Sequence, residues 1–365
     1  MIFGCVLLVV VTYLILIILL FIKVKSVELS NTKIDLEEVT LVIPFRNEVG
    51  NLPNLLNQLN LLKEIPISII FVNDHSSDNS MELVKDFLNQ NNKFKLVNLS
   101  DDFIGKKRAI QKGVEEAKTE FILTIDADVS ISDDYFQKIR QLNHKYDMYI
   151  LPVHPISSNF WSKIFSMEYL FFNAFNYLVT PFYVLSASGA NLLFRKEAYL
   201  KNQEVVLSQN NLSGDDYFLL RAFQEDNRII QVHDFSSSVI KTNESTNFKN
   251  YLAQRTRWLG KTKSNIQMKE FFLGLLILAF LWIPLGLSLY YILTQNYLIG
   301  LIFLIAQFVI SFSILKKYLV SEKLNFMMLL FFLIFYPFLF LTTLIFSLII
   351  SPNWKGRTLR NNLIV

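Results

Sequence analysis

Residues 121–129 read FILTIDADV, five apolar or β-branched residues followed by two aspartates with one alanine between them. The first five residues have the composition of a buried β-strand. Asp126 and Asp128 follow at its end, and side chains two residues apart in an extended chain point to the same side. Neighbouring carboxylates repel each other unless a cation lies between them, and hard oxygen ligands suit Mg²⁺ or Mn²⁺. The stretch predicts a metal site at a strand end, although a helix cap or a solvated turn also explains a lone D-x-D pair.

Other short apolar runs predict further strands of the same kind, at 39–43, 67–72, 94–98 and 147–151. Between the strands at 39–43, 67–72, 94–98 and 121–125 lie segments whose apolar residues recur with the period of a helix, at about 51–63, 78–90 and 106–118. This alternation is typical of βαβ units, so we expect an α/β domain with a mostly parallel sheet and flanking helices. Such sheets bind ligands at the carboxyl ends of their strands.

Polar residues gather at the ends of the first two strands, on the rim that also carries the D-x-D pair. They are Pro44, Arg46, Asn47 and Glu48 after the first strand, and Asn73, Asp74, His75, Ser76 and Ser77 after the second. We therefore expect the functional site at this rim.

The remaining sequence is unusually apolar. Of the 365 residues, 52% are hydrophobic, 18% are charged and 33 are Phe, which excludes disorder and disfavours a purely soluble protein. Residues 2–22 carry no charge and are long enough to cross a bilayer, which needs about 20 residues. Further uncharged stretches run from 271 to 315, interrupted only at 294–296, and from about 326 to 350. Together they predict three more membrane segments.

Basic residues predict which side of the membrane each part occupies. Lys23 and Lys25 follow the first segment, whose N-terminal flank has no Lys or Arg, so residues 23–270 are expected in the cytoplasm. A cleaved signal peptide is the alternative, but the segment lacks a basic flank before it and a small-x-small site after it. Lys316, Lys317 and Lys323 fit a second cytoplasmic loop.

The C-terminal tail conflicts with four complete crossings. These would place Lys355, Arg357 and Arg360 outside, against the positive-inside rule, so we expect that one segment does not cross fully. Pro284 and Pro337 mark candidate breaks, because a proline removes a helix hydrogen bond.

Charge and cysteine content exclude other classes. A net charge of +4 is too small for a nucleic-acid footprint, and the single cysteine, Cys5, allows no intramolecular disulfide or cysteine-based zinc cluster. The four histidines, His75, His144, His154 and His233, have no spacing typical of metal ligands.

Seven motifs occur in one order between residues 39 and 260: VIPFRNE (42–48), FVNDHSSDNS (71–80), GKKRAIQKG (105–113), TIDADV (124–129), SGANLLFRKEAY (188–199), SGDDYFLL (213–220) and QRTRW (254–258). In this order they resemble the family 2 glycosyltransferases, membrane-bound GT-A enzymes that include cellulose and hyaluronan synthases. The resemblance implies a Rossmann-like GT-A domain, a nucleotide-sugar donor, a divalent cation (Mg or Mn) and transfer with inversion.

The resemblance also implies roles for individual residues at the donor side. Asp74 would read the donor base, and Pro44, Arg46 and Glu48 would line the nucleoside pocket. Asn73 departs from the Asp that the family usually has, which removes a charge at the rim. Lys106 would lie near the donor phosphates, where a point charge acts well, although KKR also fits a solvated first helical turn. Asp126 and Asp128 match the D-x-D motif, and Asp128 would be the direct metal ligand.

The remaining motifs imply a base and an acceptor site. Asp216 would be the catalytic base, because an acceptor hydroxyl needs its proton removed as it attacks. Asp215 is its acidic neighbour and also fits a helix N-cap. Gly189 and Asn191 would lie near the acceptor.

Gln254, Arg257 and Trp258 match Q-x-x-R-W, and their spacing puts them on one face of a helix. Arg257 would bind the departing diphosphate together with Gln254, and Trp258 would stack on the acceptor. An interfacial helix whose Arg and Trp anchor at lipid head groups is the alternative. Residues 159–185 are aromatic with helical spacing and predict an amphipathic helix on the bilayer, or else a buried core helix.

The sequence therefore predicts four parts: a transmembrane anchor at 1–23, a GT-A domain with interfacial helices at 24–270, transmembrane segments at 271–352 and a basic tail at 353–365. The expected protein is an inverting glycosyltransferase that moves one sugar to a lipid or saccharide acceptor at the cytoplasmic face of a membrane, as in a bacterial inner membrane. Its partners would be the donor, the acceptor and membrane lipid, with no nucleic acid. A processive polysaccharide synthase and a catalytically silent membrane scaffold are the alternatives.

Overall fold

The computed structural model describes residues 2–22, 32–89, 94–208, 214–262, 267–320, 323–349, 353–354 and 357–358. The chain divides into two compact units. The sheet unit consists of Ser26–Ile156, Ser186–Asn243 and Asn353–Val365, and the helical unit of Met1–Lys25, Ser157–Leu185 and Glu244–Pro352. The division differs from the contiguous domain expected at 24–270, because two helical stretches within that range belong to the helical unit.

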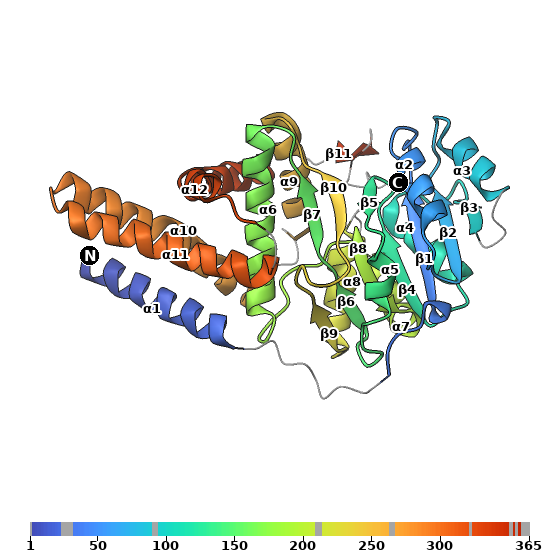
Figure 1. Cartoon of the computed structure of the whole chain (residues 1–365), viewed down its shortest axis with the longest axis horizontal. Helices are drawn as coiled ribbons and strands as arrows, with labels where there is room; N and C mark the ends of the chain where they lie inside the picture. Colours follow the sequence, from blue (N-terminus) through green and yellow to red (C-terminus); the bar gives the residue numbers. More distant parts are fainter. Residues whose placement is uncertain are drawn as a thin grey trace. The chain divides into compact units, whose positions relative to one another are not determined.

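A seven-stranded sheet forms the core of the sheet unit (Figure 1). Its order is β3 (Phe94–Asn98), β2 (Ser68–Asn73), β1 (Val39–Phe45), β4 (Phe121–Ile125), β8 (Asn191–Arg195), β6 (Met148–Ile150) and β9 (Ile230–Val232). Strands β3, β2, β1 and β4 are parallel, whereas β8 is antiparallel to both β4 and β6. The sheet is mostly parallel, as the alternating pattern predicted.

The predicted strands and helices lie where the sequence placed them. All residues of β1 and β4 are buried, which explains their continuous apolar composition. The intervening helices are α2 (Leu52–Leu61), α3 (Ser80–Leu88) and α4 (Lys106–Glu116).

Pro44 lies within β1, where pairing with β4 has already ended at Val42, so its missing N–H costs no bond to that strand.

A second, smaller sheet was not predicted. It consists of β5 (Val129–Ile131), β10 (Ile240–Asn243) and β7 (Val153–Ile156), and β5 follows the D-x-D motif directly. The other elements of the sheet unit are the 3₁₀ turn η1 (Leu36–Glu38), α5 (Tyr135–Ile139), α7 (Lys196–Ser208), α8 (Asp215–Glu225), β11 (Asn353–Trp354) and β12 (Arg357–Thr358). Of the basic tail, Lys355 and Arg360 lie outside the described residues.

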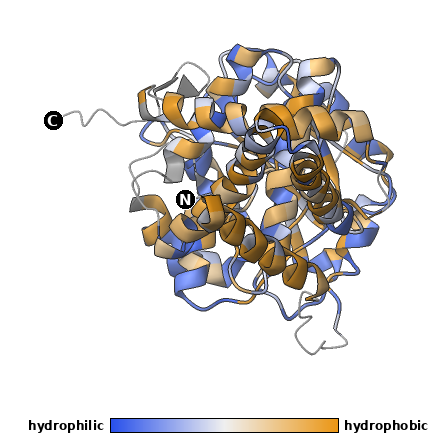
Figure 2. Cartoon of the chain, turned by 90° about the vertical axis from the view of Figure 1, so that its left-hand side faces the viewer, coloured by the Kyte–Doolittle hydropathy of each residue, from blue (hydrophilic) through white to orange (hydrophobic). Residues whose placement is uncertain are grey.

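The helical unit contains the apolar segments. Its helices are α1 (Ile2–Phe21), α6 (Phe160–Val179), α9 (Phe248–Thr262), α10 (Met268–Leu293), α11 (Tyr297–Leu319) and α12 (Phe326–Ile349). Among the described residues, α1, α10, α11 and α12 are long and apolar enough to cross a membrane. Figure 2 shows the helices that face the viewer coloured as hydrophobic along most of their length.

Neither proline breaks its helix, which corrects the expectation from the sequence. Helix α10 continues through Pro284 and α12 through Pro337. Each proline removes one backbone hydrogen bond, a loss that packing against neighbouring helices tolerates. The interruption at 294–296 does separate two helices, and Gln295 adopts a positive φ of 63° in the turn.

Helix α6 packs as a buried helix within the helical unit. Twelve of its 20 residues are buried, and its neighbours include α11 and α12. Phe160 and Trp161, at its start, remain about half exposed. Of the two alternatives for residues 159–185, the structure supports a helix with most of its surface buried.

Candidate active site

The loops that follow β1 and β2 are joined side by side by hydrogen bonds. The Asn47 side-chain oxygen accepts a hydrogen bond from the backbone N–H of Ser77 at 2.8 Å. The backbone N–H of Glu48 donates to Oγ of Ser80 at 2.7 Å, and that of Val49 donates to Asp78 at 3.2 Å. Residues that lie about 30 positions apart in the sequence therefore form one polar surface at the rim.

Arg46 fixes the backbone that carries Asp74. Its Nη1 atom donates to the carbonyl oxygens of Asp74 and His75, at 2.8 and 2.7 Å. Asp74 is only 2% exposed, and its backbone N–H donates to Phe45. These contacts support the loop predicted to bind the donor base, while the base contact itself stays a prediction. On the neighbouring loop, the Glu48 carboxylate accepts a hydrogen bond from the Asn51 side chain at 2.7 Å.

The side-chain amide of Asn73 both donates and accepts a hydrogen bond. Its Nδ2 donates to the Asn98 side-chain oxygen at 3.0 Å, and its Oδ1 accepts from the backbone N–H of Ser76 at 3.0 Å. A carboxylate at this position has no donor for the first of these bonds. The departure from the usual Asp therefore fits a local pairing with Asn98 on the adjacent strand.

Lys106 lies at the centre of the site. Gly105, with φ 95°, precedes α4, so that Lys106 is the first residue of the helix. The Lys106 ammonium lies 2.6 Å from Oδ1 of Asp126 and 3.6 Å from Oδ2 of Asp215. Burial opposes the charge of this amine, but the carboxylates of Asp126, Asp215 and Asp216 outweigh it and raise its pKa. The alternative of a solvated first helical turn is wrong for Lys106.

A second helix begins at the same place with the acidic pair. Gly214, with φ 99°, is the N-cap of α8, and Asp215 and Asp216 form its first turn. Asp215 is therefore not the cap, in contrast to the alternative considered from the sequence. Carboxylates in a first turn also interact favourably with the helix dipole. The two positive-φ glycines place Lys106 and the acidic pair at the starts of two helices.

Gly189 fits tightly against this group. Its backbone N–H donates to Oδ2 of Asp216 at 3.2 Å. A Cβ atom at this position would lie 2.4 Å from Oδ2 of Asp215 and 3.1 Å from the Lys106 ammonium. A side chain at residue 189 would therefore displace the Asp215 carboxylate or the Lys106 ammonium, which is consistent with a glycine in the SGANLLFRKEAY motif.

Asp128 lies in the turn directly after β4. Desolvation by the surrounding atoms, and then the negative charges of Asp126 and Glu48, raise the pKa of its carboxyl. Such a cluster of carboxylates favours a positive charge, and its oxygen atoms are the ligands that Mg²⁺ and Mn²⁺ prefer. The oxygen donors of these residues therefore suit a divalent cation, and the metal site itself stays a prediction.

Asn191, predicted near the acceptor, has a structural set of contacts. Its side chain is fully buried, accepts from the Tyr135 hydroxyl at 2.6 Å, and donates to the carbonyls of Pro152 and Ser238 at 2.8 and 2.9 Å. It thus joins β8 to segments far apart in the sequence. Its role at the acceptor stays a prediction.

Gln254, Arg257 and Trp258 lie on α9, in the helical unit, whereas the other candidate residues belong to the sheet unit. Arg255, which was not predicted as a site residue, organises this helix. It is 4% exposed, and its guanidinium donates to Glu168 at 2.8 Å, Glu244 at 3.1 Å and the Gln254 side chain at 2.7 Å.

The same guanidinium also lies against an aromatic side chain of the motif. Its central carbon is 4.3 Å from the Trp258 ring centroid, a cation–π geometry. Burial opposes the Arg255 charge, but the carboxylates of Glu168 and Glu244 raise its pKa. Arg255 thus holds both Gln254 and Trp258 of the Q-x-x-R-W motif.

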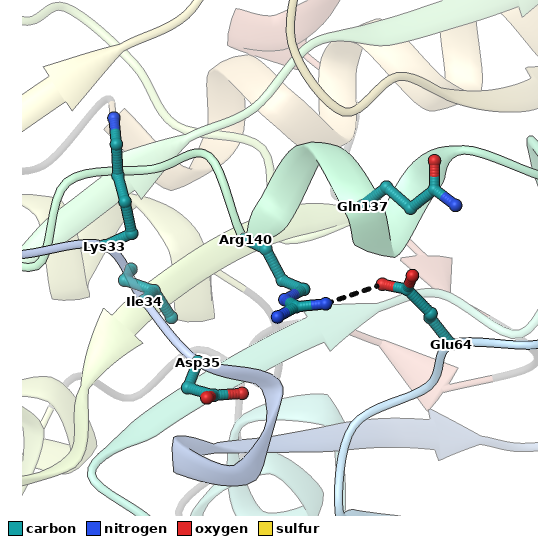
Figure 3. A pocket seen from close by; sticks show the side chains of 6 residues that line it. All are labelled: Lys33, Ile34, Asp35, Glu64, Gln137 and Arg140. Atoms are coloured by element: carbon teal, nitrogen blue, oxygen red, sulfur yellow. Dashed lines mark hydrogen bonds and ion pairs between the residues drawn. The ribbon is translucent and has the colours of Figure 1, made fainter.

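Two further polar features lie away from the rim. A depression of about 440 Å³ is lined by Lys33, Ile34, Asp35, Glu64, Gln137 and Arg140, and two of these residues, Arg140 and Glu64, form an ion pair at 3.3 Å (Figure 3). Near the starts of β1 and β4, Glu38, Glu120 and His144 approach one another, a cluster that sequence spacing does not reveal. Arg195 pairs with Glu120 and so compensates part of its charge.

Comparison with known proteins finds similarity in the first half of the chain. Residues 40–202 match the family model described as "Glycosyl transferase family 2". The poly-beta-1,6-N-acetyl-D-glucosamine synthase of Staphylococcus epidermidis is 31% identical over 110 residues, which are 30% of this chain and 26% of that protein. The enzyme of the same name from Staphylococcus aureus is 29% identical over 139 residues, which are 37% and 33%. The chain thus spans between a quarter and a third of the length of these relatives.

A solved structure shares the fold. The mannosyltransferase PcManGT from Pyrobaculum calidifontis, in complex with GDP-Man and Mn²⁺, has a TM-score of 0.54 and 13% identity, covering 95% of this chain and 96% of its own. The sheet unit has the GT-A fold. Residues 40–202 are similar to the family 2 glycosyltransferases, as the motifs predicted, and the described residues include the four apolar helices that hydropathy predicted.

Proposed function

We propose that this protein is a membrane glycosyltransferase that moves a sugar from a nucleoside diphosphate sugar to a lipid or saccharide acceptor, with inversion at the anomeric carbon. The observation that carries the proposal is the contact of Lys106 with both Asp126 and Asp215 at the rim of a GT-A sheet. One cation thereby joins the D-x-D motif to the start of α8, which carries the proposed base.

The donor side of the site supports a diphosphate leaving group. Asp126 and Asp128 would hold Mg²⁺ or Mn²⁺, which when bound supplies positive charge to the departing diphosphate. Lys106 adds a fixed positive charge beside them, and Asp74, held by the loop that Arg46 supports, would read the base. The mannosyltransferase of the same fold binds GDP-Man and Mn²⁺, which is consistent with these roles.

Asp216 would be the general base. The acceptor hydroxyl attacks the anomeric carbon on the face opposite the diphosphate, the bond from that carbon to the phosphate oxygen breaks, and the hydroxyl proton passes to Asp216. The Gly189 N–H at Oδ2 and the Tyr217 N–H at Oδ1, at 3.2 and 2.8 Å, hold the carboxylate in a fixed orientation. A single displacement of this kind inverts the sugar.

Gly189 and Asn191 of the sheet unit would lie near the acceptor. For the α9 motif of the helical unit, the roles implied by the sequence motif stay predictions: Arg257 and Gln254 for the diphosphate, and Trp258 for the acceptor. Lys23 and Lys25, which follow α1 in the sequence, support a proposed cytoplasmic location of the sheet unit, as in a bacterial inner membrane. An acceptor embedded in the membrane would then meet a donor made in the cytoplasm.

The test is turnover by the purified protein in detergent, with a panel of UDP- and GDP-sugars, Mg²⁺ or Mn²⁺, and membrane lipids as acceptors. We expect release of a nucleoside diphosphate from one donor and loss of this release with EDTA. Turnover that persists in EDTA would contradict the metal role. Absence of both turnover and calorimetric binding for every donor would support the silent scaffold.

A processive polysaccharide synthase is the second candidate, and the names of the two staphylococcal relatives favour it. The uncharged interiors of the apolar helices favour single transfer, because a polar polymer crossing the membrane needs polar walls. Product size on a gel decides between the two. A ladder indicates a synthase, and a single lipid-linked species indicates one transfer.

A further inference from the structure

Helix α12 runs across the other apolar helices of the helical unit. In Figure 1, α1, α10 and α11 lie alongside one another in the plane of the view, whereas α12 is drawn end-on. With 20, 26 and 23 residues, α1, α10 and α11 are about 30–39 Å long at 1.5 Å per residue. Each therefore matches the thickness of a bilayer core. A helix that lies across this direction does not follow the membrane normal.

Lys317 establishes which helix ends share a side. Its ammonium donates to the carbonyl oxygens of Leu19, Leu20 and Ile22, at 3.0, 3.0 and 2.9 Å. Lys317 is in the last turn of α11, and these carbonyls end α1, where helical carbonyls have no partner within the helix. The C-terminal ends of α1 and α11 thus lie together, and the short turn at 294–296 places α10 antiparallel to α11.

Helix α12 is apolar on two opposite faces. Its inner face contributes Leu329, Phe332, Tyr336 and Leu339, and Leu339 packs with Ile164 and Phe165 of α6 and Tyr251 and Leu252 of α9. Its outer face is a stripe between 40% and 61% exposed, with helical spacing: Met327, Leu330, Ile334, Phe338, Leu341 and Ile345. None of the 24 residues is charged. This stripe therefore requires an apolar solvent.

The two short strands after α12 belong to the sheet unit. Asn353–Trp354 and Arg357–Thr358 form β11 and β12, and the division of the chain assigns them to that unit. Helices α10 and α11 are antiparallel, so together they cross the membrane and return. The chain therefore starts α12 on the side of the membrane where α1 ends. A fourth crossing would put the tail on the opposite side from the unit to which it belongs.

We propose that α12 lies in the plane of the membrane, with its outer stripe among the acyl chains of the leaflet at which α1 and α11 end, and that the chain crosses the membrane three times. A helix in this position has its apolar face buried about 5–10 Å into the boundary between head groups and acyl chains. Lys355, Arg357 and Arg360 are then on the same side as Lys23 and Lys25, which satisfies the positive-inside rule. The proposal concerns membrane placement and is independent of the catalytic activity.

Spin-label depth measurements test the orientation in vesicles of phosphatidylethanolamine and phosphatidylglycerol. Single cysteines replace Met327, Ile334, Phe338 and Ile345 of the α12 stripe, in a full-length Cys5→Ser background. The matched controls are Leu298, Ile302, Ile305 and Val309, an exposed row on α11. We expect equal depths along α12 and a steady change along α11, whose labels span 11 residues, or about 16 Å. A similar change along α12 would overturn the proposal.

Labelling of intact cells with an impermeant maleimide tests the side of the tail. Asn296→Cys, between α10 and α11, should react from outside, whereas Thr358→Cys and the sheet-unit control Lys118→Cys should react only after permeabilisation. Reaction of Thr358→Cys in intact cells would show a fourth crossing. Protection of Asn296→Cys would show that α10 and α11 do not cross, and would equally overturn the proposal.

Discussion

The Lys106 ammonium lies 2.6 Å from the Asp126 carboxylate, so the first residue of α4 and the first residue after β4 form an ion pair. Replacing Lys106 with Met removes the fixed positive charge beside the proposed diphosphate. We expect kcat/KM to fall about 100- to 1000-fold, the effect of losing one preorganised electrostatic contact. Lys112→Met is the matched control on the same helix, because its surface pair with Glu116 contributes little. Equal activity of the two variants would exclude the proposed role.

Asp216→Asn removes the proposed base and keeps an oxygen that accepts from the Gly189 N–H. We expect transfer to fall about 100- to 10,000-fold, the usual contribution of a general base, with donor binding retained. Initial rates and calorimetric titration with the donor measure the two quantities. Loss of donor binding would instead assign Asp216 to the donor site.

Alanine substitutions at Gly189 and Gly113 compare a close contact in the proposed site with a close contact in the core. Gly189→Ala places a Cβ against Asp215 and Lys106, so we expect a large loss of activity with a small change in melting temperature. Gly113→Ala places a Cβ 2.4 Å from Cγ1 of Val42, in the packing of α4 on β1, and overpacking of this kind costs about 1–3 kcal/mol. Its melting temperature should fall, while the remaining folded enzyme keeps its specific activity. The reverse pattern would contradict this account of Gly189.

The buried pair of Arg255 and Glu168 should show strong coupling. Removing one partner of a buried ion pair costs about 3–5 kcal/mol, because the other charge stays buried. In a cycle of Arg255→Met, Glu168→Gln and the double variant, we expect a clear coupling of melting temperatures. The surface pair Lys138–Asp134 is the control and should show none. Additive effects at Arg255 and Glu168 would mean that their contact does not stabilise the helical unit.

Lys107 gives a pH dependence. Burial, only partly offset by Asp215, lowers its pKa from 10.5 to about 8, and its ammonium lies 5.0 Å from the Phe218 ring centroid and donates to the Val206 carbonyl at 3.3 Å. Because the fold disfavours the charged form, Lys107 lowers the free energy of unfolding. This destabilisation is complete below about pH 8 and disappears as the pH rises toward 10.5. Neighbouring ionisable groups are Asp215, Arg108 and Tyr199.

We therefore expect Lys107→Met to raise the melting temperature at pH 7, with a smaller gain at each step between pH 8 and 10.5. Melting curves of the two proteins across this range measure the difference. A constant difference at all pH values would show that the charge of Lys107 is not the cause. The exposed Lys112→Met provides the pH control.

The sequence predicted the parallel half of the sheet well, because apolar runs and helical periods alternate there. It did not predict that β8 is antiparallel, since NLLFR has the same apolar composition as a parallel strand. The rim was predictable from strand ends, and the structure brings Lys106, Asp126, Asp215, Asp216 and Gly189 together. The sequence did not separate Arg255 from Arg257, because both are arginines in the same motif. Arg255 differs in being buried, which only the structure shows. Hydropathy predicted the length of α12, but it contains no information on the orientation of this helix relative to α1, α10 and α11.

The contact of Lys317 with the end of α1 has a consequence for biogenesis. The ammonium that binds the Leu19 carbonyl is added 298 residues after it. At about 5–20 residues per second, α1 waits roughly 15–60 s during translation for this partner. Until then its last carbonyls face the lipid head groups or the insertion machinery, so a nascent chain halted before α11 should present an uncapped first helix to membrane quality control.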